Sequence, residues 1–544
     1  MVATTTAQGL PEPIPLKVLF GNADKRMPRI SPDGKYYAYL ADAANGVTNV
    51  FVKPVTFDGT DATEAQQVTS EDHRPLRYFV WAKSIDKRRI LYVQDTGGDE
   101  NFHLHVAEFD VDAATHKPHT IKLSHKSPNT AIVSLNNRDE RYFDALRVNL
   151  VTGELETLYE NPGDVNMWLV DDDFQVVGAF SMSNADGSES LRVPTVPGDK
   201  NVAEWKVIAH WPHGEICNVH KVSKDGKVAY VETSLLHTGD ATATESTNTS
   251  RLVLLSLEDG KELQVIAQDE LCDLSKVSFN DTTSTVQYVV FNYTKPRVHI
   301  VDETVRGDLE FLLAHTRFSL VSASDDNQTW ISTGYGKRWT NLGDCQWGAT
   351  MQQDLTDAVE WVVKQGYADA SRVAIYGGSY GGYAALAGLA FTPEVYACGV
   401  DIVGPSHIKT LFESIPPYWA PMKKMLVLRV GDVENDDAIN RKISPLYHAD
   451  KMTKPLLIAQ GSNDPHVKKA ESDQIAKKLY ENKHDVEYVL YTDEGRGFAR
   501  PPNRLDFTWR AEAFLAKHLG GRLVPKDETL VEGNSAVLID PATL

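Results

Sequence analysis

A serine in a glycine-rich stretch has the surroundings of an exposed nucleophile. The residues RVAIYGGSYGGYAALAGLA, at 372–390, place Ser379 between two pairs of glycines. A β-branched run precedes it, and small and apolar residues follow at helical spacing, which predicts a strand, a sharp turn and a helix. Such a turn strains the serine backbone and exposes its hydroxyl. The backbone N–H of Tyr380 can then face a developing oxyanion. We therefore expect a nucleophile at Ser379, and not a bystander in a turn.

An acid follows in the order that such a serine requires. The run PLLIAQG, at 455–461, is typical of a fully buried parallel strand. Asp464 lies in the Gly-Ser-Asn-Asp-Pro turn directly after it. In a hydrolase built on such a sheet, the chain order is serine, acid, base. We expect Asp464 to orient the base, although a plain turn aspartate would look the same.

The elements around these residues indicate a parallel sheet covered by helices. Helical spacing and β-branched or apolar runs alternate after about residue 350, which is the pattern of an α/β layer structure. The expected helices are 351–365, 470–480 and 505–519, and the expected strands are 372–376, 397–403, 455–461 and 486–491.

The first 330 or so residues have a different pattern of secondary structure. Short strands are separated by turns such as SPDGK, at 31–35, and the unit repeats on the order of every 40 to 55 residues. This spacing favours four-stranded propeller blades over a stacked β-sandwich.

The composition excludes several classes of protein. The 544 residues carry a formal charge of −20 without a basic run, which argues against nucleic-acid binding. No apolar run is long enough for a bilayer span, and the N-terminus lacks the pattern of a secretion signal. The four cysteines are scattered and suit a reducing compartment, so we expect a cytoplasmic protein. We see no metal-ligand spacing and no phosphate loop, and we expect no cofactor.

These motifs together resemble the prolyl oligopeptidase family of serine peptidases, most closely its acylaminoacyl-peptidase and dipeptidyl-peptidase-like members. The resemblance covers nearly the whole chain. The residues that carry it are GGSYGGYAALAGLAFTPE around Ser379, STGYGKRW at 332–339, KPLLIAQGSNDPHV at 454–467, EGRGFARPPNRLDF at 494–507 and GGDENFHLHV at 97–106.

The resemblance implies a β-propeller followed by an α/β-hydrolase domain. We expect an N-terminal extension at 1–25, the propeller at 26–330, the hydrolase at 331–522 and a C-terminal tail at 523–544. It also implies hydrolysis of short or acylated peptides at a serine, with the propeller limiting entry to small substrates. It leaves the oligomeric state and the residue specificity open.

One position departs from the family pattern. The family has histidine in Glu-Gly-His-Gly-Phe, and this chain has Arg496 there. A guanidinium stays protonated near neutral pH and has no lone pair, so it cannot act as a general base. We expect Arg496 to pair with Asp464 as a fork, which leaves the Ser379 hydroxyl without a proton acceptor. The chain is then weakly active or inactive.

Three histidines follow Asp464 and could in principle replace the base. His484 precedes a strand and His518 lies on a terminal helix facing solvent, so we interpret both as structural. His466 could reach the site only if its loop were rebuilt.

A second departure is a gap before Ser332. Family members carry a strand-rich stretch with a His-Gly-Gly-Pro turn there, which holds the first hydrolase strands and part of the oxyanion hole. Here Trp330 is followed by Ile331 and then directly by the STGYGK segment. We therefore expect an incomplete propeller and a hydrolase sheet that lacks its first strands. A non-catalytic peptide- or protein-binding protein and an incomplete product of a gene for an active peptidase remain alternatives.

Other residues near these motifs are weaker candidates. Pro416-Pro417-Tyr418-Trp419 could line a pocket or simply pack in the core. Arg500 and Arg504 could bind a substrate carboxylate or serve solubility. The acids near the elbow in sequence, for which we expect a solvated surface role, are Glu394, Asp401 and Glu413.

Overall fold

The computed structural model describes residues 14–315 and 337–544. Within these ranges it leaves out residues 33, 55–64, 84–87, 101, 109–110, 117–120, 125, 240–244, 281–282 and 294. The expected junction at 326–336 lies outside the described residues.

The first part of the chain is a β-propeller, as the recurring turns and strands predict. Its described strands form six antiparallel sheets, of which five have four strands and the sixth has three. Apolar strand residues form buried clusters between neighbouring sheets. The sheets are β1 (Arg26–Ile30), β2 (Tyr36–Asp42), β3 (Thr48–Pro54) and β4 (Gln66–Gln67); β5 (Phe79–Trp81), β6 (Arg89–Gln94), β7 (His103–Glu108) and β8 (Val111–His116); β9 (Ile121–Leu123), β10 (Thr130–Asp139), β11 (Tyr142–Asn149) and β12 (Leu155–Tyr159); β13 (Val165–Val170), β14 (Val176–Met182), β15 (Glu189–Val193) and β16 (Lys206–Trp211); β17 (Cys217–Val222), β18 (Val228–Leu235), β19 (Ser246–Ser256) and β20 (Glu262–Gln268); and β21 (Leu274–Phe279), β22 (Val286–Asn292) and β23 (Pro296–Ile300).

The second part is a mostly parallel sheet with helices on both faces, as expected for an α/β-hydrolase domain. The strand order is β24 (Ala374–Gly378), β25 (Cys398–Ile402), β26 (Leu456–Gly461), β27 (Val486–Tyr491) and β28 (Ala536–Leu538). The first four strands run parallel, and β28 pairs antiparallel with β27. Strand β28 lies in the segment that we expected to be a tail. Its three half-buried or exposed residues give little hydrophobic signal.

The helices place apolar faces against this sheet. Helices α5 (Tyr380–Phe391) and α9 (Lys469–Glu481) pack on one face around Ile375 and Ile458. Helix α10 (Pro501–Leu519) packs on the other face around Val400 and Leu457. The remaining described helices are α1 (Leu16–Phe20), α2 (Arg306–His315), α3 (Lys337–Asn341), α4 (Thr350–Lys364), α6 (Ile408–Glu413), α7 (Lys423–Val430) and α8 (Asp437–Ile443).

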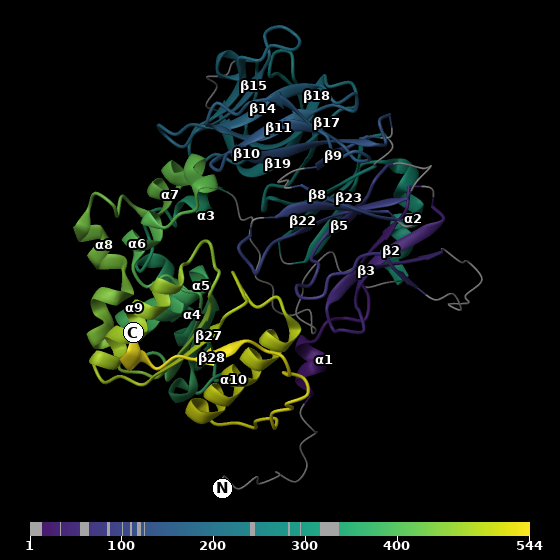
Figure 1. Cartoon of the computed structure of the whole chain (residues 1–544). Coiled ribbons are helices and arrows are strands. Elements are labelled where there is room, and N and C mark those ends of the chain that lie inside the picture. The colour runs from purple at the N-terminus through teal and green to yellow at the C-terminus, as the bar shows by residue number, and fades with distance from the viewer. Residues whose placement is uncertain are drawn as a thin grey trace.

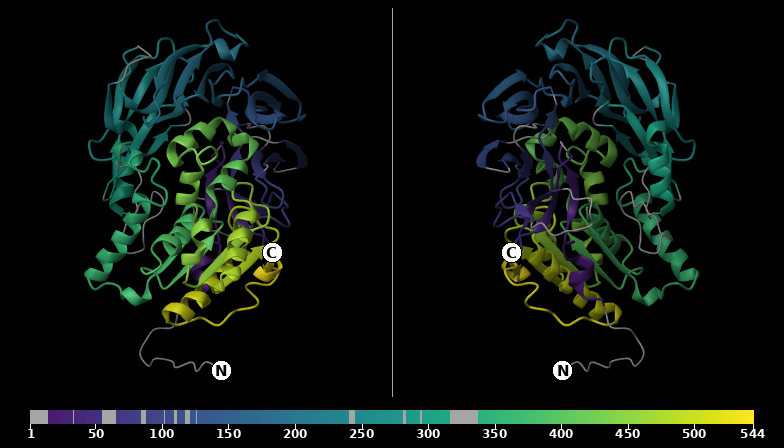
Figure 2. Two further views of the ribbon diagram at one scale, coloured as in Figure 1. Left: turned by 90° about the vertical axis from the view of Figure 1, so that its left-hand side faces the viewer. Right: turned by 90° about the vertical axis from the view of Figure 1, so that its right-hand side faces the viewer.

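Figures 1 and 2 show the propeller and the hydrolase domain side by side, with the propeller sheets fanning out around the hydrolase. Helix α1 precedes the propeller but packs on α10 through Leu16, Leu505 and Val531. The N-terminal segment therefore ties the two domains together.

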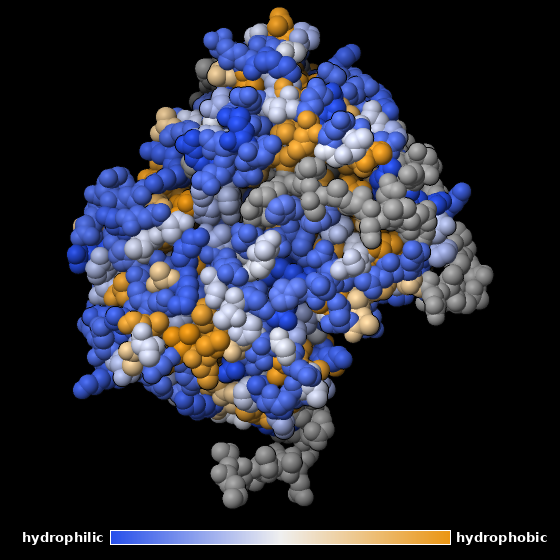
Figure 3. Space-filling view, in the orientation of Figure 1, coloured by the Kyte–Doolittle hydropathy of each residue, from blue (hydrophilic) through white to orange (hydrophobic). Residues whose placement is uncertain are grey.

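Strand β24 is the edge of the hydrolase sheet among the described residues. Its Tyr376 is 51% exposed, and on the nearby helix α4 and the turn after it Trp361 and Tyr367 are 57% and 77% exposed. Large aromatic side chains at a sheet edge are unusual on a monomer surface. The face in Figure 3 is mostly hydrophilic, with apolar residues gathered over part of the hydrolase domain.

Candidate active site

The stretch around Ser379 forms the sharp strand-to-helix turn that its sequence predicts. Ser379 has φ 59° and ψ −118°, and it directly precedes helix α5. Its N–H donates to the Ile402 carbonyl at 2.9 Å, which fixes the turn to strand β25. A Cβ on Gly377 would lie 2.3 Å from the Gly381 carbonyl oxygen, so a side chain cannot stand there. The tight turn leaves Ser379 partly exposed at the carboxyl end of the sheet.

The backbone N–H of Tyr380 lies at the first position of helix α5. The first N–H groups of a helix have no acceptor within it and carry its positive partial charge. This N–H can therefore stabilise negative charge beside the Ser379 hydroxyl.

Arg496 reaches the serine. Its Nη2 donates a short hydrogen bond to Ser379 Oγ. We expected Arg496 to pair with Asp464, but these two side chains form no ion pair, so that expectation is wrong. The guanidinium bonds to the hydroxyl instead because Asp464 is anchored deep in its own turn.

The Asp464 carboxylate is buried, and part of its hydrogen-bonding capacity is unused. Its side chain is 2% exposed, and Oδ1 accepts from the backbone N–H of His466 at 2.8 Å and of Val467 at 2.9 Å. Oδ2 is buried without a hydrogen-bond partner. Burial raises the pKa of this carboxyl above its ordinary value, against the two N–H bonds and the charge of Arg496. An orienting acid in a hydrolase would use this free oxygen to accept from a base.

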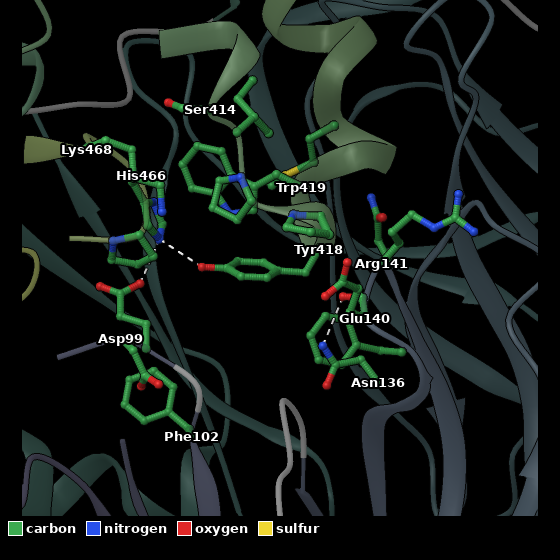
Figure 4. Close-up of a pocket in the computed structure, with 18 of the residues that line it drawn as sticks. Asp99, Phe102, Asn136, Glu140, Arg141, Ser414, Tyr418, Trp419, His466 and Lys468 are labelled. Atoms are coloured by element: carbon green, nitrogen blue, oxygen red, sulfur yellow. Dashed lines mark hydrogen bonds and ion pairs between the residues drawn. The ribbon is translucent and has the colours of Figure 1, made fainter. Parts of the chain in front are cut away.

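His466 does not take the place of the base. Its Nε2 lies 2.7 Å from Glu100 Oε2 and 3.1 Å from the Tyr418 hydroxyl. Figure 4 shows the ring turned toward Tyr418 across the pocket. The Trp419 ring packs edge-on at 4.3 Å between centroids. These contacts hold the imidazole toward the propeller and not toward Ser379.

Glu100 was not foreseen as a site residue. It belongs to the GGDENFHLHV motif of the propeller and has φ 54°, a strained value for a residue with a side chain. The hydrogen bond with His466, with help from the charges of Arg496 and Arg77 and against burial, lowers the pKa of Glu100. The sequence motif marked this loop, but only the domain contact gives its carboxylate a partner.

The same loop sets how the two domains meet. A Cβ on Gly98 would lie 2.3 Å from the Gly495 backbone nitrogen, so the two loops touch backbone to backbone. Glu494 is fully buried and accepts from Arg74 of the propeller at 3.2 Å. Glu494 also accepts from the Arg500 backbone N–H at 2.8 Å. The Arg496 loop is therefore held from both domains.

A pocket of about 880 Å³ opens beside this contact, between propeller and hydrolase. Tyr418, Trp419 and the two prolines before them line it, which confirms the pocket interpretation of that motif. Figure 4 shows Tyr418 and Trp419 with Asp99 on one side and Glu140 and Arg141 of the propeller on the other. Burial raises the pKa of Tyr418 to about 12, so the phenol stays protonated and can donate.

The structure agrees with some of the remaining expectations from the sequence and contradicts that for Asp401. Glu394 and Glu413 are exposed, as expected. The surface role expected for Asp401 is wrong, because it is fully buried behind the elbow, where burial raises its pKa well above the ordinary value. The sequence did not reveal this because the exposure of a residue depends on neighbours from distant segments. Arg500 pairs with Asp493, and Arg504 lies at a second, smaller pocket.

The described residues offer nothing for two other kinds of site. Within this part of the chain, no three His, Cys, Asp or Glu side chains lie close enough together to hold a metal ion. No described helix has the length and apolarity needed to cross a bilayer.

Comparison with known proteins supports the same family along the chain. A model of the prolyl oligopeptidase family matches residues 328–522. Dipeptidyl aminopeptidase BIII of Pseudoxanthomonas mexicana is 32% identical over an alignment of 634 positions. This alignment covers 93% of this chain and 88% of that protein. Dipeptidyl peptidase family member 6 of Caenorhabditis elegans is 26% identical and covers 94% of this chain and 87% of that protein.

The fold is also found among solved structures. Acylaminoacyl peptidase of Pyrococcus horikoshii matches with a TM-score of 0.51 and 16% identity, over 94% of this chain and 91% of that chain. At this identity the likeness shows the shared propeller and hydrolase architecture.

Proposed function

The chain belongs to the prolyl oligopeptidase family of serine peptidases, and from this premise we propose that it binds short peptides at Ser379 and hydrolyses them slowly or not at all. The observation that carries the proposal is the hydrogen bond from Arg496 to Ser379 Oγ. Arg496 occupies the position where the family has its histidine.

The bond has the wrong direction for catalysis. A nucleophilic serine must donate its proton to a base, whereas here the hydroxyl oxygen accepts a hydrogen bond from a guanidinium, which has no lone pair to take that proton. Among the described histidines, none is hydrogen-bonded to Ser379 or to Asp464 Oδ2. Loss of the base typically removes on the order of 10⁴- to 10⁶-fold of the rate.

The oxyanion site is a second reason for slow turnover. The N–H of Tyr380 supplies one donor, and we propose that the segment before Ser332 would supply the other. The alignment with the aminopeptidase of Pseudoxanthomonas mexicana is longer than this whole chain, so that protein has residues without a counterpart here. This supports the gap inferred from the sequence.

The pocket suits a short peptide with an apolar residue. Its volume of about 880 Å³ is in the range of small-molecule sites, and Tyr418, Trp419 and Phe102 give it an apolar wall. The carboxylates of Asp99 and Glu100 lie at the propeller side. They suit the ammonium group of a free peptide N-terminus, the end that an aminopeptidase recognises.

Peptide binding and peptide turnover can be measured separately. We expect a fluorescent tripeptide with a free N-terminus to bind, by anisotropy, equally to the parent chain and to Ser379→Ala. Trp419→Ala should weaken binding, and Trp361→Ala, an aromatic loss far from the pocket, should not. Chromatography of the same mixtures should show intact peptide. Rapid hydrolysis that Ser379→Ala abolishes would refute the binding role and leave the family assignment intact.

An incomplete gene product is the second candidate. The free edge of strand β24 favours it, since the nucleophile strand lies at the sheet edge among the described residues. Sequencing the gene between the codons for Trp330 and Ser332 tests it. An in-frame stretch encoding His-Gly-Gly-Pro would support this candidate, and the codon for Ile331 alone between them would exclude it.

A further inference from the structure

A second pocket, away from Ser379, lies where the propeller meets helix α10. Its volume is about 230 Å³. Since a water molecule takes about 30 Å³ of liquid, the space suits a few waters or one small ion. Residues from both domains line it: Asn22, Arg26, Met27, Leu40, Thr48, Pro75, Leu76, Arg77, Ala499 and Arg504.

Three arginines line this pocket. Arg26 and Arg77 come from the propeller, and Arg504 comes from α10. Burial and the positive charge of Arg26 lower the pKa of Arg504, as expected where like charges face each other. Two carboxylates, Asp42 and Glu494, counter part of this effect on Arg504. Asp42 lies 3.9 Å from Arg26 Nη2, which is longer than an ordinary hydrogen bond.

The local hydrogen bonds leave this positive charge incompletely matched. Asp42 already accepts from Asn22 at 2.9 Å and from Thr48 at 2.7 Å. Arg504 donates only to neutral oxygens, including the Phe20 carbonyl at 3.0 Å and Asn22 Oδ1 at 2.9 Å. Arg26 Nε is buried and has no hydrogen-bond partner at all. A buried donor on a cation without an acceptor is costly, which indicates that an acceptor belongs there.

The backbone of strand β1 is irregular beside Arg26. Strand β1 has an irregular register between Arg26 and Arg29, and Met27 between them has φ 51°. Such an extra residue in a strand redirects a neighbouring side chain. Arg26 Nη2 donates to Thr48 Oγ1 at 2.7 Å, and both residues line the pocket.

We propose that this pocket binds a small oxyanion, of the size of phosphate, which bridges Arg26 and Arg77 of the propeller to Arg504 of helix α10. Guanidinium groups are matched to oxyanions because their N–H donors can bond two oxygens at once. The bound ion fastens the two domains together. The proposal does not depend on any activity of Ser379.

The test is calorimetric titration of inorganic phosphate into the full chain, with sodium chloride keeping the ionic strength constant. We expect saturable binding of one phosphate and a rise in the unfolding temperature that follows its occupancy. Arg77→Gln is the principal variant, because Arg77 is exposed and its loss should not affect folding. It should weaken binding by about tenfold to a hundredfold, as for one charge-assisted hydrogen bond.

Two further variants complete the design. Arg26→Gln should weaken binding at least as much, since it removes the unpartnered donor. Arg338→Gln, an exposed arginine outside the pocket, should bind phosphate like the parent. A parallel titration with succinate distinguishes a carboxylate ligand from phosphate, and either ion supports the oxyanion site. Absent binding, or binding that Arg77→Gln and Arg26→Gln leave unchanged, overturns it.

Discussion

The bond from Arg496 to Ser379 predicts the reactivity of the serine in the parent chain. Because no histidine or carboxylate of the described residues is hydrogen-bonded to this hydroxyl, we expect labelling by a fluorophosphonate probe on the order of 10⁴- to 10⁶-fold slower than for a complete triad. At 1.36 kcal/mol per decade, this is about 5–8 kcal/mol of barrier.

Arg496→His tests how much of this barrier belongs to the base. The buried Oδ2 of Asp464 has no partner, so it can accept from the Nδ1–H of an imidazole placed there. Labelling should therefore become faster than in the parent. Peptide turnover should still be at least a hundredfold below that of a complete enzyme, because one missing oxyanion donor costs about 10²–10³ in rate.

The assay is the second-order labelling rate, with mass spectrometry to locate the adduct. Ser379→Ala defines the background, and Arg338→His is the matched control, since it makes the same exchange at an exposed arginine outside the site. Rapid stoichiometric labelling of Ser379 in the parent chain would refute the reasoning on the base. Full peptide turnover by Arg496→His would refute the reasoning on the oxyanion site.

Three further predictions concern stability and association. Burial raises the pKa of Glu189 to about 7 from 4.5, so between these pH values the folded chain holds a proton that the unfolded chain has released, and stability is lost as the pH rises. In thermal unfolding, Glu189→Gln should be more stable than the parent near pH 8 and equal to it near pH 4. A difference that stays constant with pH would contradict this assignment. Arg74→Met should cost about 3–5 kcal/mol in urea unfolding, because it leaves the buried Glu494 carboxylate without its cation, and a change below 1 kcal/mol would show that water replaces the pair. Tyr376→Lys and Trp361→Lys should each reduce concentration-dependent association measured by light scattering, and unchanged association would mean that the β24 edge is not a contact surface.

The sequence predicts a local element well where one local property, such as the need for glycine or the apolar periodicity, decides its structure. The elbow around Ser379 could be predicted because glycines are needed wherever a strand and a helix cross closely. Strand β27 and helix α9 follow from apolar periodicity, which is a local property of the chain. The short strand β28 was not predicted, since three residues paired at a sheet edge show almost no apolar periodicity.

Charge pairing is where sequence reasoning was least complete. The choice of Arg496 between the Asp464 carboxylate and the Ser379 hydroxyl depends on which oxygen lies within reach, and the sequence gives no distances. The burial of Asp401 was hidden for the same reason, because exposure depends on neighbours from distant segments.

The sequence by itself determined the sharp turn at Ser379 and the order of the propeller and the hydrolase domain. These follow from residue types and their spacing along one chain. Only the tertiary structure decided that Glu100 of the propeller holds His466, that Arg74 holds Glu494, and that three arginines converge at one pocket. Electrostatic partners act through space over a few ångströms, and residues hundreds of positions apart reach that distance only when the domains dock.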